Sequence, residues 1–431
     1  MASSIESNLV VNKSTPEPNQ HTPQDIEITV YDAPPNRGFR AWTQVMGSFF
    51  LFFNSWGVVN TFGVFQTYYE INLLSVQSSS NILWIGAIQA FLLLLVGVVT
   101  GPLYDASYFR ALIITGSGLV VVGFMTLSLC TKYWQIILAQ ALCIGLGNEC
   151  LYIPFVAILP QYFSSRKAIA TGIAASGSSF GGVLYPILFR QLQPRIGFAW
   201  ATRVLGFIVL ATSLLSIGVM RARRMPPTKR VSLELSAFKE PPYALFCIAM
   251  LLGYIGIFCP IFYIQSYAVG TETMGEDLAF YLVAILNAAS IPGRIVPGLL
   301  GPRIGPLNIL LTSAAISGTL IMCWIGIQSS SGLVALAVLY GFISGAFVSL
   351  PAVALTGLTE DLRTLGTRMG MCSVLCGFGS LCGAPVAGAI LNASDSYLGV
   401  QLYARVATYA TAVLLLLSHV SKVGVKFMAK A

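Results

Sequence analysis

The sequence predicts an all-α polytopic membrane protein with twelve transmembrane helices in two six-helix halves. Three observations indicate this fold class. The 431 residues are 56% hydrophobic and only 9% charged, whereas a soluble domain carries roughly 25% charged residues. Twelve apolar runs approach or exceed the ~20 residues that a spanning helix needs. Residues 221–242, the longest polar interruption after the N-terminal tail, divide these runs into six and six.

Residues 1–40 precede the first apolar run and are rich in Ser, Asn, Pro, Gln and acidic residues. They are too hydrophilic for a secretory signal, and their composition predicts a disordered cytosolic tail. The first span then serves as the insertion signal.

The two halves are predicted at residues 41–220 and 243–422, joined by a cytosolic linker at 221–242 and followed by a short cytosolic tail at 423–431. Many runs contain Gly or Pro, as packed membrane helices do. In order, the predicted spans are 42–68, 82–100, 111–130, 134–162, 169–189, 198–220, 243–267, 278–300, 307–327, 333–358, 365–391 and 398–420.

The distribution of charge gives the orientation. If the N-terminus is cytosolic, 18 of the 24 Lys and Arg residues lie on the inner side and three on the outer side. This bias follows the positive-inside rule and places both termini in the cytosol. The net charge of +8 therefore faces anionic lipid and cytosol, and nucleic acid is not expected as a partner. The plasma membrane is the expected location, with a vacuolar or other internal membrane as the alternative.

The connection between the second and third spans contains Gly101, Asp105 and Arg110. The Gly101-Pro102 pair is predicted to end the preceding helix, because proline lacks a backbone N–H and clashes with the previous turn. The simple alternative is a solvated hairpin. The pattern, however, resembles the gating loop between helices 2 and 3 of a major facilitator superfamily transporter.

A second motif follows the fourth span and includes Tyr162, Phe163, Arg166, Gly172 and Gly177. Together with the entry to the first span, this motif resembles the fungal form of the monocarboxylate-transporter branch of that superfamily. The resemblance covers nearly all of residues 36–420. It implies the major facilitator fold and a central cavity that opens to each side in turn.

The sequence departs from the branch at positions that couple protons in well-studied members. The helix 1 lysine position falls on Asn60, and the helix 8 acid position falls on Ser290, while the helix 8 arginine is kept as Arg294. The drug-antiporter branches carry an Arg in helix 4, where this chain has Gln140. The resemblance therefore implies a substrate other than lactate and disfavours a drug antiporter.

Two ionisable residues inside predicted spans are candidates for transport, because a charge in the membrane is costly and usually functional. Arg294 could hold a carboxylate through two parallel hydrogen bonds. Glu149 could bind and release a proton. The alternatives are snorkelling of Arg294 and a structural pair between a base and Glu149. Further candidates for the cavity are polar or aromatic: Asn60, Tyr152, Tyr263, Gln265, Asn287 and Phe347.

Several other classes of site find no support in the sequence. Two His residues cannot build a membrane metal site, and no phosphate-binding loop is present, so neither a cofactor nor a nucleotide is expected. An enzyme is not expected either. Asn392 begins a glycosylation sequon in the predicted outer loop, but it lies about five residues from the bilayer, which disfavours its use.

These features predict a secondary active transporter of small organic anions or amphipathic metabolites. Its expected partners are a small-molecule substrate, the lipid bilayer and protons. We favour efflux of a secondary metabolite. The alternatives are a proton-linked importer of a monocarboxylate or vitamin-like nutrient and, more remotely, a sensor with a transporter fold.

Overall fold

Helices that are long and apolar enough to cross a membrane dominate the computed structural model, which describes residues 35–105, 108–164, 166–223, 234–359 and 365–424. Among these residues, ten helical segments have the required length and hydropathy. One of them, α9 (Lys167–Val219), holds two spans joined at Gly197, where φ is 76°. Helices α4 (Ser79–Leu95) and α5 (Gly97–Asp105) together form another span. The prediction of twelve spans is therefore confirmed.

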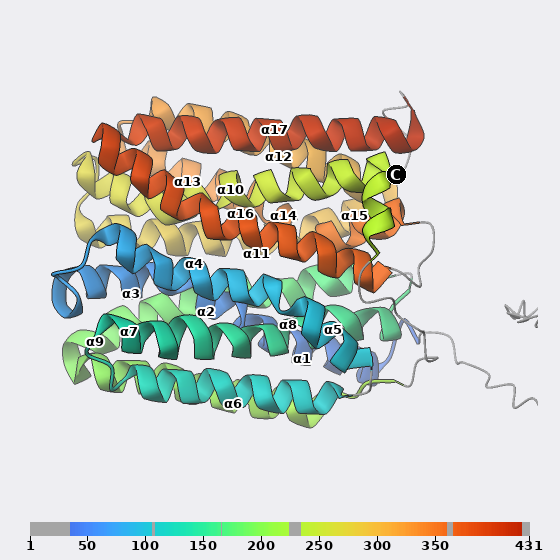
Figure 1. Cartoon of the computed structure of the whole chain (residues 1–431), viewed down its shortest axis with the longest axis horizontal. Coiled ribbons are helices and arrows are strands. Elements are labelled where there is room, and N and C mark those ends of the chain that lie inside the picture. The colour runs from blue at the N-terminus through green and yellow to red at the C-terminus, as the bar shows by residue number, and fades with distance from the viewer. Residues whose placement is uncertain (1–34, 106–107, 165, 224–233, 360–364, 425–431) are drawn as a thin grey trace, which may run out of the picture. The chain divides into compact units, whose positions relative to one another are not determined.

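Residues 1–34 of the tail predicted at 1–40 lie outside the described part of the structure. So do residues 224–233 of the linker and residues 425–431 at the C-terminus. The first half ends with α9, and Figure 1 shows its helices in the lower part of the view. Its remaining elements are α1 (Phe39–Asn54), α2 (Trp56–Asn60), α3 (Phe62–Tyr68), the π-helix η1 (Tyr69–Leu73), α6 (Phe109–Leu127), α7 (Tyr133–Ile136), the π-helix η2 (Ile137–Ile144) and α8 (Gly145–Tyr162).

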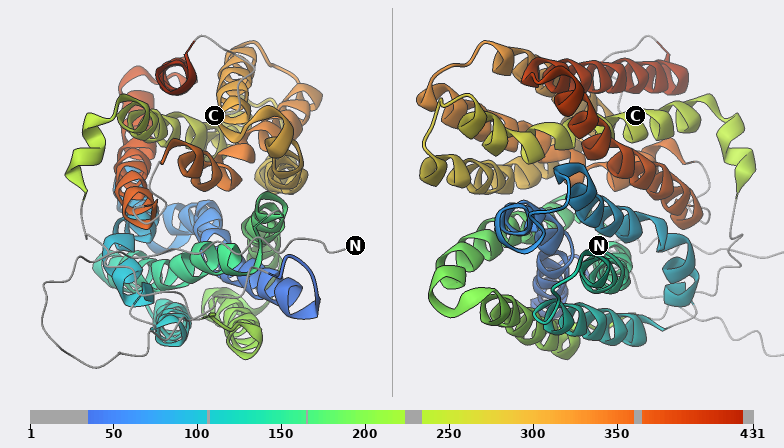
Figure 2. Two further views of the ribbon diagram at one scale, coloured as in Figure 1. Left: turned by 90° about the vertical axis from the view of Figure 1, so that its right-hand side faces the viewer. Right: turned by 60° about the vertical axis from the view of Figure 1, so that its left-hand side comes forward.

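The second half occupies the upper part of Figure 1, and the view along the helices separates the same two groups (Figure 2, left). The halves meet along two helix pairs, α9 with α11 and α4 with α16. The elements of this half are the 3₁₀-helix η3 (Leu235–Lys239), α10 (Pro241–Gly270), α11 (Glu276–Ile304), α12 (Pro306–Ile325), α13 (Ser330–Ser344), α14 (Ala346–Ser349), α15 (Pro351–Leu358), α16 (Leu365–Ser394) and α17 (Tyr397–Val423).

Large apolar side chains face outward from both halves. Phe207 and Leu214 of α9 and Val406 and Val413 of α17 are all exposed. In water, such surfaces would be an aggregation hazard, but lipid solvates them. The outward face therefore fits a multi-pass membrane protein.

Two spans that the sequence predicts as continuous are interrupted in the structure. The first span breaks at Ser55 and Thr61, which separate α1, α2 and α3. The tenth span breaks at Gly345 and Leu350, which separate α13, α14 and α15. Interrupted helices are tolerated at membrane depth where protein or a polar cavity surrounds the backbone. The breaks at Ser55 and Gly345 lie beside the candidate site described below.

The expectation that Gly101-Pro102 ends the second span is wrong, since α5 continues to Asp105. Helix α10 likewise continues through Pro260. The physical reason is that lipid supplies no hydrogen bonds, so the backbone gains more by staying helical than it loses at one missing N–H.

The described ends of the linker are attached to different halves. The backbone N–H of Arg221 donates to Gln44 Oε1 of α1 at 2.9 Å. On the other side, Arg368 of α16 donates to Glu240 at 2.6 and 2.7 Å and to Glu234 at 3.2 Å. Hydrogen bonding to this guanidinium lowers the pKa of Glu240, just before α10. Each half therefore holds its own end of the linker.

Candidate functional site

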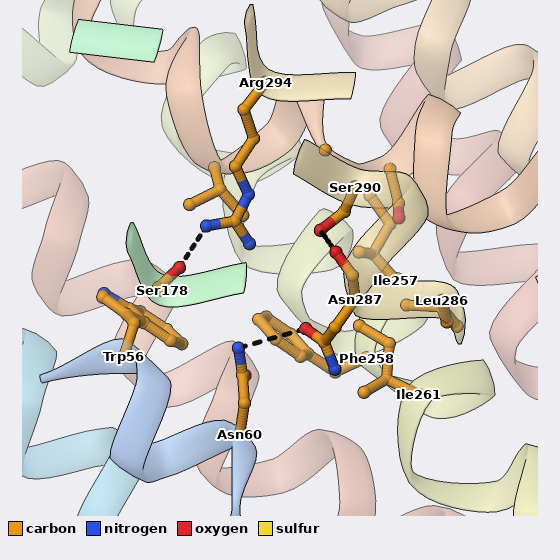
Figure 3. A pocket seen from close by; sticks show the side chains of 13 residues that line it. Trp56, Asn60, Ser178, Ile257, Phe258, Ile261, Leu286, Asn287, Ser290 and Arg294 are labelled. Atoms are coloured by element: carbon orange, nitrogen blue, oxygen red, sulfur yellow. Dashed lines mark hydrogen bonds between the residues drawn. The ribbon is translucent and has the colours of Figure 1, made fainter. Parts of the chain in front are cut away.

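A cavity lies between the two halves, and Figure 3 shows the side chains that face it. The lining comes from α2 and α9 of the first half and from α10, α11 and the α13–α14 junction of the second. The cavity is small, with a volume of about 30 Å³. Its distinctive lining residues are Trp56, Asn60, Phe258, Asn287, Ser290 and Arg294.

Glycines at the helix breaks allow backbones to approach closely around the cavity. A Cβ at Gly57, one residue into α2, would lie 2.9 Å from the Cα of Gly181 on α9. A Cβ at Gly345 would lie 2.8 Å from the backbone of Gly293 on α11. Only glycine fits these two crossings without displacing a helix, so the sequence fixes where the lining helices meet.

Arg294 is the charged member of the lining and is only 4% exposed. Its Nη1 donates to the carbonyl of Ala175 at 2.6 Å and to Ser178 Oγ, both on α9. Its Nε is buried and has no hydrogen-bond partner among the residues that the structure describes. None of the described acidic side chains forms an ion pair with Arg294. The guanidinium is therefore held across the interface by neutral groups, with donor capacity left over.

Neutral polar groups also connect the halves beside Arg294. Asn60 Nδ2 donates to Asn287 Oδ1 at 3.4 Å, a long hydrogen bond that opens easily. Ser290 Oγ donates to the Asn287 carbonyl at 2.8 Å. Because its one proton is then engaged, Ser290 Oγ accepts a hydrogen bond from the hydroxyl of Ser179, 2.5 Å away. Figure 3 shows Asn60, Asn287, Ser290 and Arg294 around one space.

An aromatic pair forms another side of the cavity. The rings of Trp56 (α2) and Phe258 (α10) are stacked, with centroids 5.9 Å apart and planes 7° apart. Ile257, Ile261 and Leu286 extend the apolar lining. The site thus combines one cation, two amides, hydroxyl groups and an aromatic surface.

The structure brings together three of the seven residues predicted for the transport pathway, namely Asn60, Asn287 and Arg294. It places the others elsewhere. The hydroxyl of Tyr263 donates to the Ala384 carbonyl of α16 at 2.8 Å. Gln265 is partly exposed outside the lining, and the Phe347 ring is buried near Gly253.

Tyr152, a further cavity candidate, lies outside the lining. Its ring is tilted against those of Phe52 and Phe155, with centroids 6.0 and 6.2 Å away. Tyr152 therefore belongs to the aromatic packing of the first half.

Glu149 lies in α8, away from Arg294, with 0% of its surface exposed. Thr100 Oγ1 of α5 donates to its Oε1 at 3.0 Å, and Oε2 has no hydrogen-bond partner in the described part of the chain. The alternative of an ion pair between Glu149 and Arg294 is therefore not what the structure shows. The two buried ionisable groups occupy separate places.

The residues of the predicted gating loop are only partly described. Gly101 and Asp105 belong to α5, and Arg110 is exposed in the first turn of α6. Residues 106–107 and the side chain of Asp105 lie outside the described part of the structure. At the other end of the molecule, Asn392 is exposed in the last turn of α16.

The second motif joins several elements. The hydroxyl of Tyr162 donates to the Arg221 carbonyl at 2.7 Å, and Phe163 packs edge-on against Trp42. Exposed Arg166 immediately precedes α9. Gly177 faces the backbone of Phe49 on α1.

Gly172, in the same motif, has a direct connection to the cavity. A Cβ there would lie 2.6 Å from the Arg294 carbonyl oxygen. The motif therefore includes a glycine that sets the position of Arg294.

Sequence reasoning missed Trp56, Ser178 and Phe258 as site residues. Ser178 lies within a run of small residues that indicates only close helix packing. For Trp56 the available signal is its place between Ser55 and Gly57, at an interruption that hydropathy does not detect. We find no sequence signal that would have selected Phe258 from the many aromatic residues.

Comparisons with known proteins agree with this architecture. The family model described as Major Facilitator Superfamily matches residues 45–330. The chain is 46% identical to "MFS-type transporter dbaD" of Emericella nidulans, over 86% of this chain and 84% of the relative. It is 39% identical to "Aspyridones efflux protein apdF" of the same organism, over 86% and 75%.

Among solved structures, the E. coli fucose:proton symporter FucP matches with a TM-score of 0.65 over 89% of this chain and 99% of that protein. At 16% identity, this likeness concerns the fold alone.

Proposed function

Since the chain belongs to the Major Facilitator Superfamily, we propose that it exports an amphipathic organic anion through the cavity that contains Arg294. We assign this role to a secondary metabolite with an acidic group, transported without chemical conversion. The name of a relative that shares 39% of its residues describes an efflux protein, which supports export over import.

The observation that carries the proposal is the unneutralised guanidinium of Arg294. A buried charge is strongly destabilising unless it is paired and hydrogen-bonded. Among the described residues, the partners of Arg294 are a carbonyl and a hydroxyl, and its Nε has none. An anionic substrate would supply the missing negative charge through charge-assisted hydrogen bonds.

The rest of the lining indicates what else the substrate contains. The Trp56–Phe258 stack offers an apolar, planar surface to an aromatic or conjugated ring. The amides of Asn60 and Asn287 can exchange their weak mutual hydrogen bond for bonds to carbonyl or hydroxyl groups. A small, fully polar acid would leave this aromatic surface unused.

The size of the cavity sets a condition on transport. Its volume suits one or two water molecules in this structure and no larger molecule. Substrate entry therefore requires the halves to separate around the cavity, as alternating access demands. We propose residues 41–220 and 243–422 as the two moving bodies, in the plasma membrane with both termini cytosolic.

Binding to the purified transporter tests the proposal. We expect planar aromatic carboxylates to quench tryptophan fluorescence, because Trp56 lines the cavity. Their methyl esters should bind at least about tenfold more weakly, because the ester lacks the charge that Arg294 attracts. Arg294→Gln should remove this difference. Arg294→Lys should restore only part of it, because lysine lacks the two-pronged donor geometry.

The matched control is Arg405→Gln, which removes a cation that lies 5.9 Å from the Tyr409 ring and outside the cavity. It should keep the preference for acids. Equal binding of acid and ester by the unaltered protein would overturn the proposal.

The direction of transport is tested in yeast cells that express the protein. Export predicts lower accumulation of a labelled acid than in cells carrying the Arg294→Gln variant. Higher accumulation would instead favour the importer, and binding without any change in accumulation would favour the sensor.

A further inference from the structure

We propose that Glu149 is a proton-binding site, separate from the Arg294 cavity, that controls a hinge between α4 and α5. The two helices form one span but meet at Val96, where the backbone turns with φ −73° and ψ −8° before α5 begins at Gly97. The carboxyl group of Glu149 lies directly against this junction. A Cβ at Gly97 would be 3.0 Å from Glu149 Oε1.

The surroundings of Glu149 suit a neutral carboxylic acid. The side chain is fully buried, and among the described residues its Oε2 has no hydrogen-bond partner and no base forms an ion pair with it. A carboxylate in this place would have one neutral hydrogen bond, from Thr100, to offset its desolvation. That is too little, since desolvation of an ion costs several kcal/mol even after relaxation.

The hydrogen bonds at the hinge also favour the protonated form. Thr100 Oγ1 lies 3.0 Å from Glu149 Oε1 and 3.3 Å from the Val96 carbonyl, yet a hydroxyl has one proton to donate. A protonated Glu149 can donate to Thr100, whose own proton then reaches Val96. Two successive hydrogen bonds, from Glu149 to Thr100 and from Thr100 to the Val96 carbonyl, then connect α8 and α5 to the hinge.

Other titratable groups near Glu149 are ordinarily neutral at pH 7. On α8 they are Cys150 and Tyr152, and on α16 they are Cys372 and Cys376, next to Tyr152. The phenol of Tyr104 on α5 accepts a hydrogen bond from Gln161. Helix α4 carries no ionisable side chain.

The charged residues of the neighbouring helices α1 and α6 are exposed at their ends. They are Arg40 and Arg110, in the first turns of α1 and α6. Among the described side chains around the hinge, Glu149 is therefore the carboxyl that can gain or lose a proton.

Loss of the proton has a mechanical consequence. The carboxylate must gain water, and the way to admit water is for α5 to swing away from α8 at Val96–Gly97. Buried side-chain atoms of Gln89 and Asn148, on the packed helices α4 and α8, have no hydrogen-bond partner among the described residues and would bind the entering water. Because α5 also packs on α16, this motion reaches the other half.

Hydrogen–deuterium exchange of α5 in the purified full-length protein tests the hinge without any transported substrate. After correction for the intrinsic pH dependence, we expect exchange over residues 97–105 to rise about tenfold between about pH 5.5 and about pH 8.5. Glu149→Gln has a side chain that is neutral at every pH, so residues 97–105 of this variant should remain protected from exchange at both pH values. Glu276→Gln, the same change at an exposed carboxyl in the first turn of α11, should keep the rise.

A second variant guards against misfolding of Glu149→Gln. Thr100→Val removes the hydroxyl but keeps the shape, and should raise exchange at the lower pH by about fivefold, the equivalent of one hydrogen bond. Protection that is independent of pH in the unaltered protein, or an unchanged rise in Glu149→Gln, would overturn the proposal. Failure of the Arg294 binding test would leave this result standing, because the two experiments share neither ligand nor residue.

Discussion

At the residue scale, the cavity depends on one charge surrounded by neutral groups. Well-studied members of the branch that this chain resembles carry a lysine at the position of Asn60 and an acid at the position of Ser290. This chain has an amide and a hydroxyl there. The structure brings both to the same cavity as Arg294. The cation therefore has no acidic neighbour in the described lining, and it should attract an anion without needing to release a proton.

Asn287→Asp tests this electrostatic argument with almost no change of shape. A carboxylate in the cavity would repel an anionic ligand and compete for Arg294, so affinity for an aromatic acid should fall at least about tenfold. The loss should grow as pH rises and the new side chain ionises. Titration of the tryptophan fluorescence of the variant and of the unaltered protein measures the loss of affinity.

The neutral methyl ester is the control ligand for Asn287→Asp. Its affinity should change far less than that of the acid. An equal loss for both ligands would indicate damage to packing rather than repulsion.

At the element scale, close contact between α9 and α11 positions the site. Arg294 reaches across to Ala175 and Ser178 because these helices approach at Gly172. Small residues permit such contacts, and in lipid they replace the hydrophobic driving force that packs helices in water.

Gly172→Ala should force the two helices apart, since the new Cβ would lie 2.6 Å from the Arg294 carbonyl oxygen. We expect a loss of about 1–3 kcal/mol in stability from overpacking, together with weaker binding of acids. Thermal unfolding of the detergent-solubilised protein measures the first effect. Gly118→Ala on α6 is the control, because no atom of the described residues lies within 4 Å of its Cβ position. A similar loss of stability there would contradict the argument.

Spans could be predicted from the sequence because hydropathy reports the length of each apolar run. Interruptions at Ser55 and Gly345 could not be predicted, because a hydropathy average over a whole span conceals an irregularity at a single residue. The residues that line the cavity were harder to predict than either the spans or their interruptions. Membrane helices are apolar on the lipid face and on the packed face, so periodicity does not tell which side of α10 presents Phe258. Arg294 was found because charge is rare at that depth, whereas Trp56 resembles every other aromatic residue.

At the scale of the whole molecule, one polar contact joins the halves at their expected outer ends. Arg190 of α9 pairs with Asp277 of α11, and its guanidinium lies 4.2 Å from the Phe280 ring. Asp277 is almost fully exposed, so this pair is expected to contribute little, within about 1 kcal/mol. A contribution this small suits a contact between the halves that must open in every transport cycle.

Arg190→Gln should therefore shift the closed-to-open ratio at this end by up to about fivefold. Distances between spin labels at Gln191 and Leu278 would report the shift. Arg195→Gln, an exposed residue on the same helix, should leave the distances unchanged. An identical distance distribution in Arg190→Gln would remove this contact from the gate.

The attachment of the linker has a consequence for how the polypeptide can be divided. Arg221 is held by α1 and Glu240 by α16, so each half keeps the segment that docks onto it. A chain divided within residues 224–233 should yield two fragments that carry complete docking surfaces. When co-expressed, they should reassociate in the bilayer through the α9–α11 and α4–α16 contacts, as a transporter made of two polypeptides.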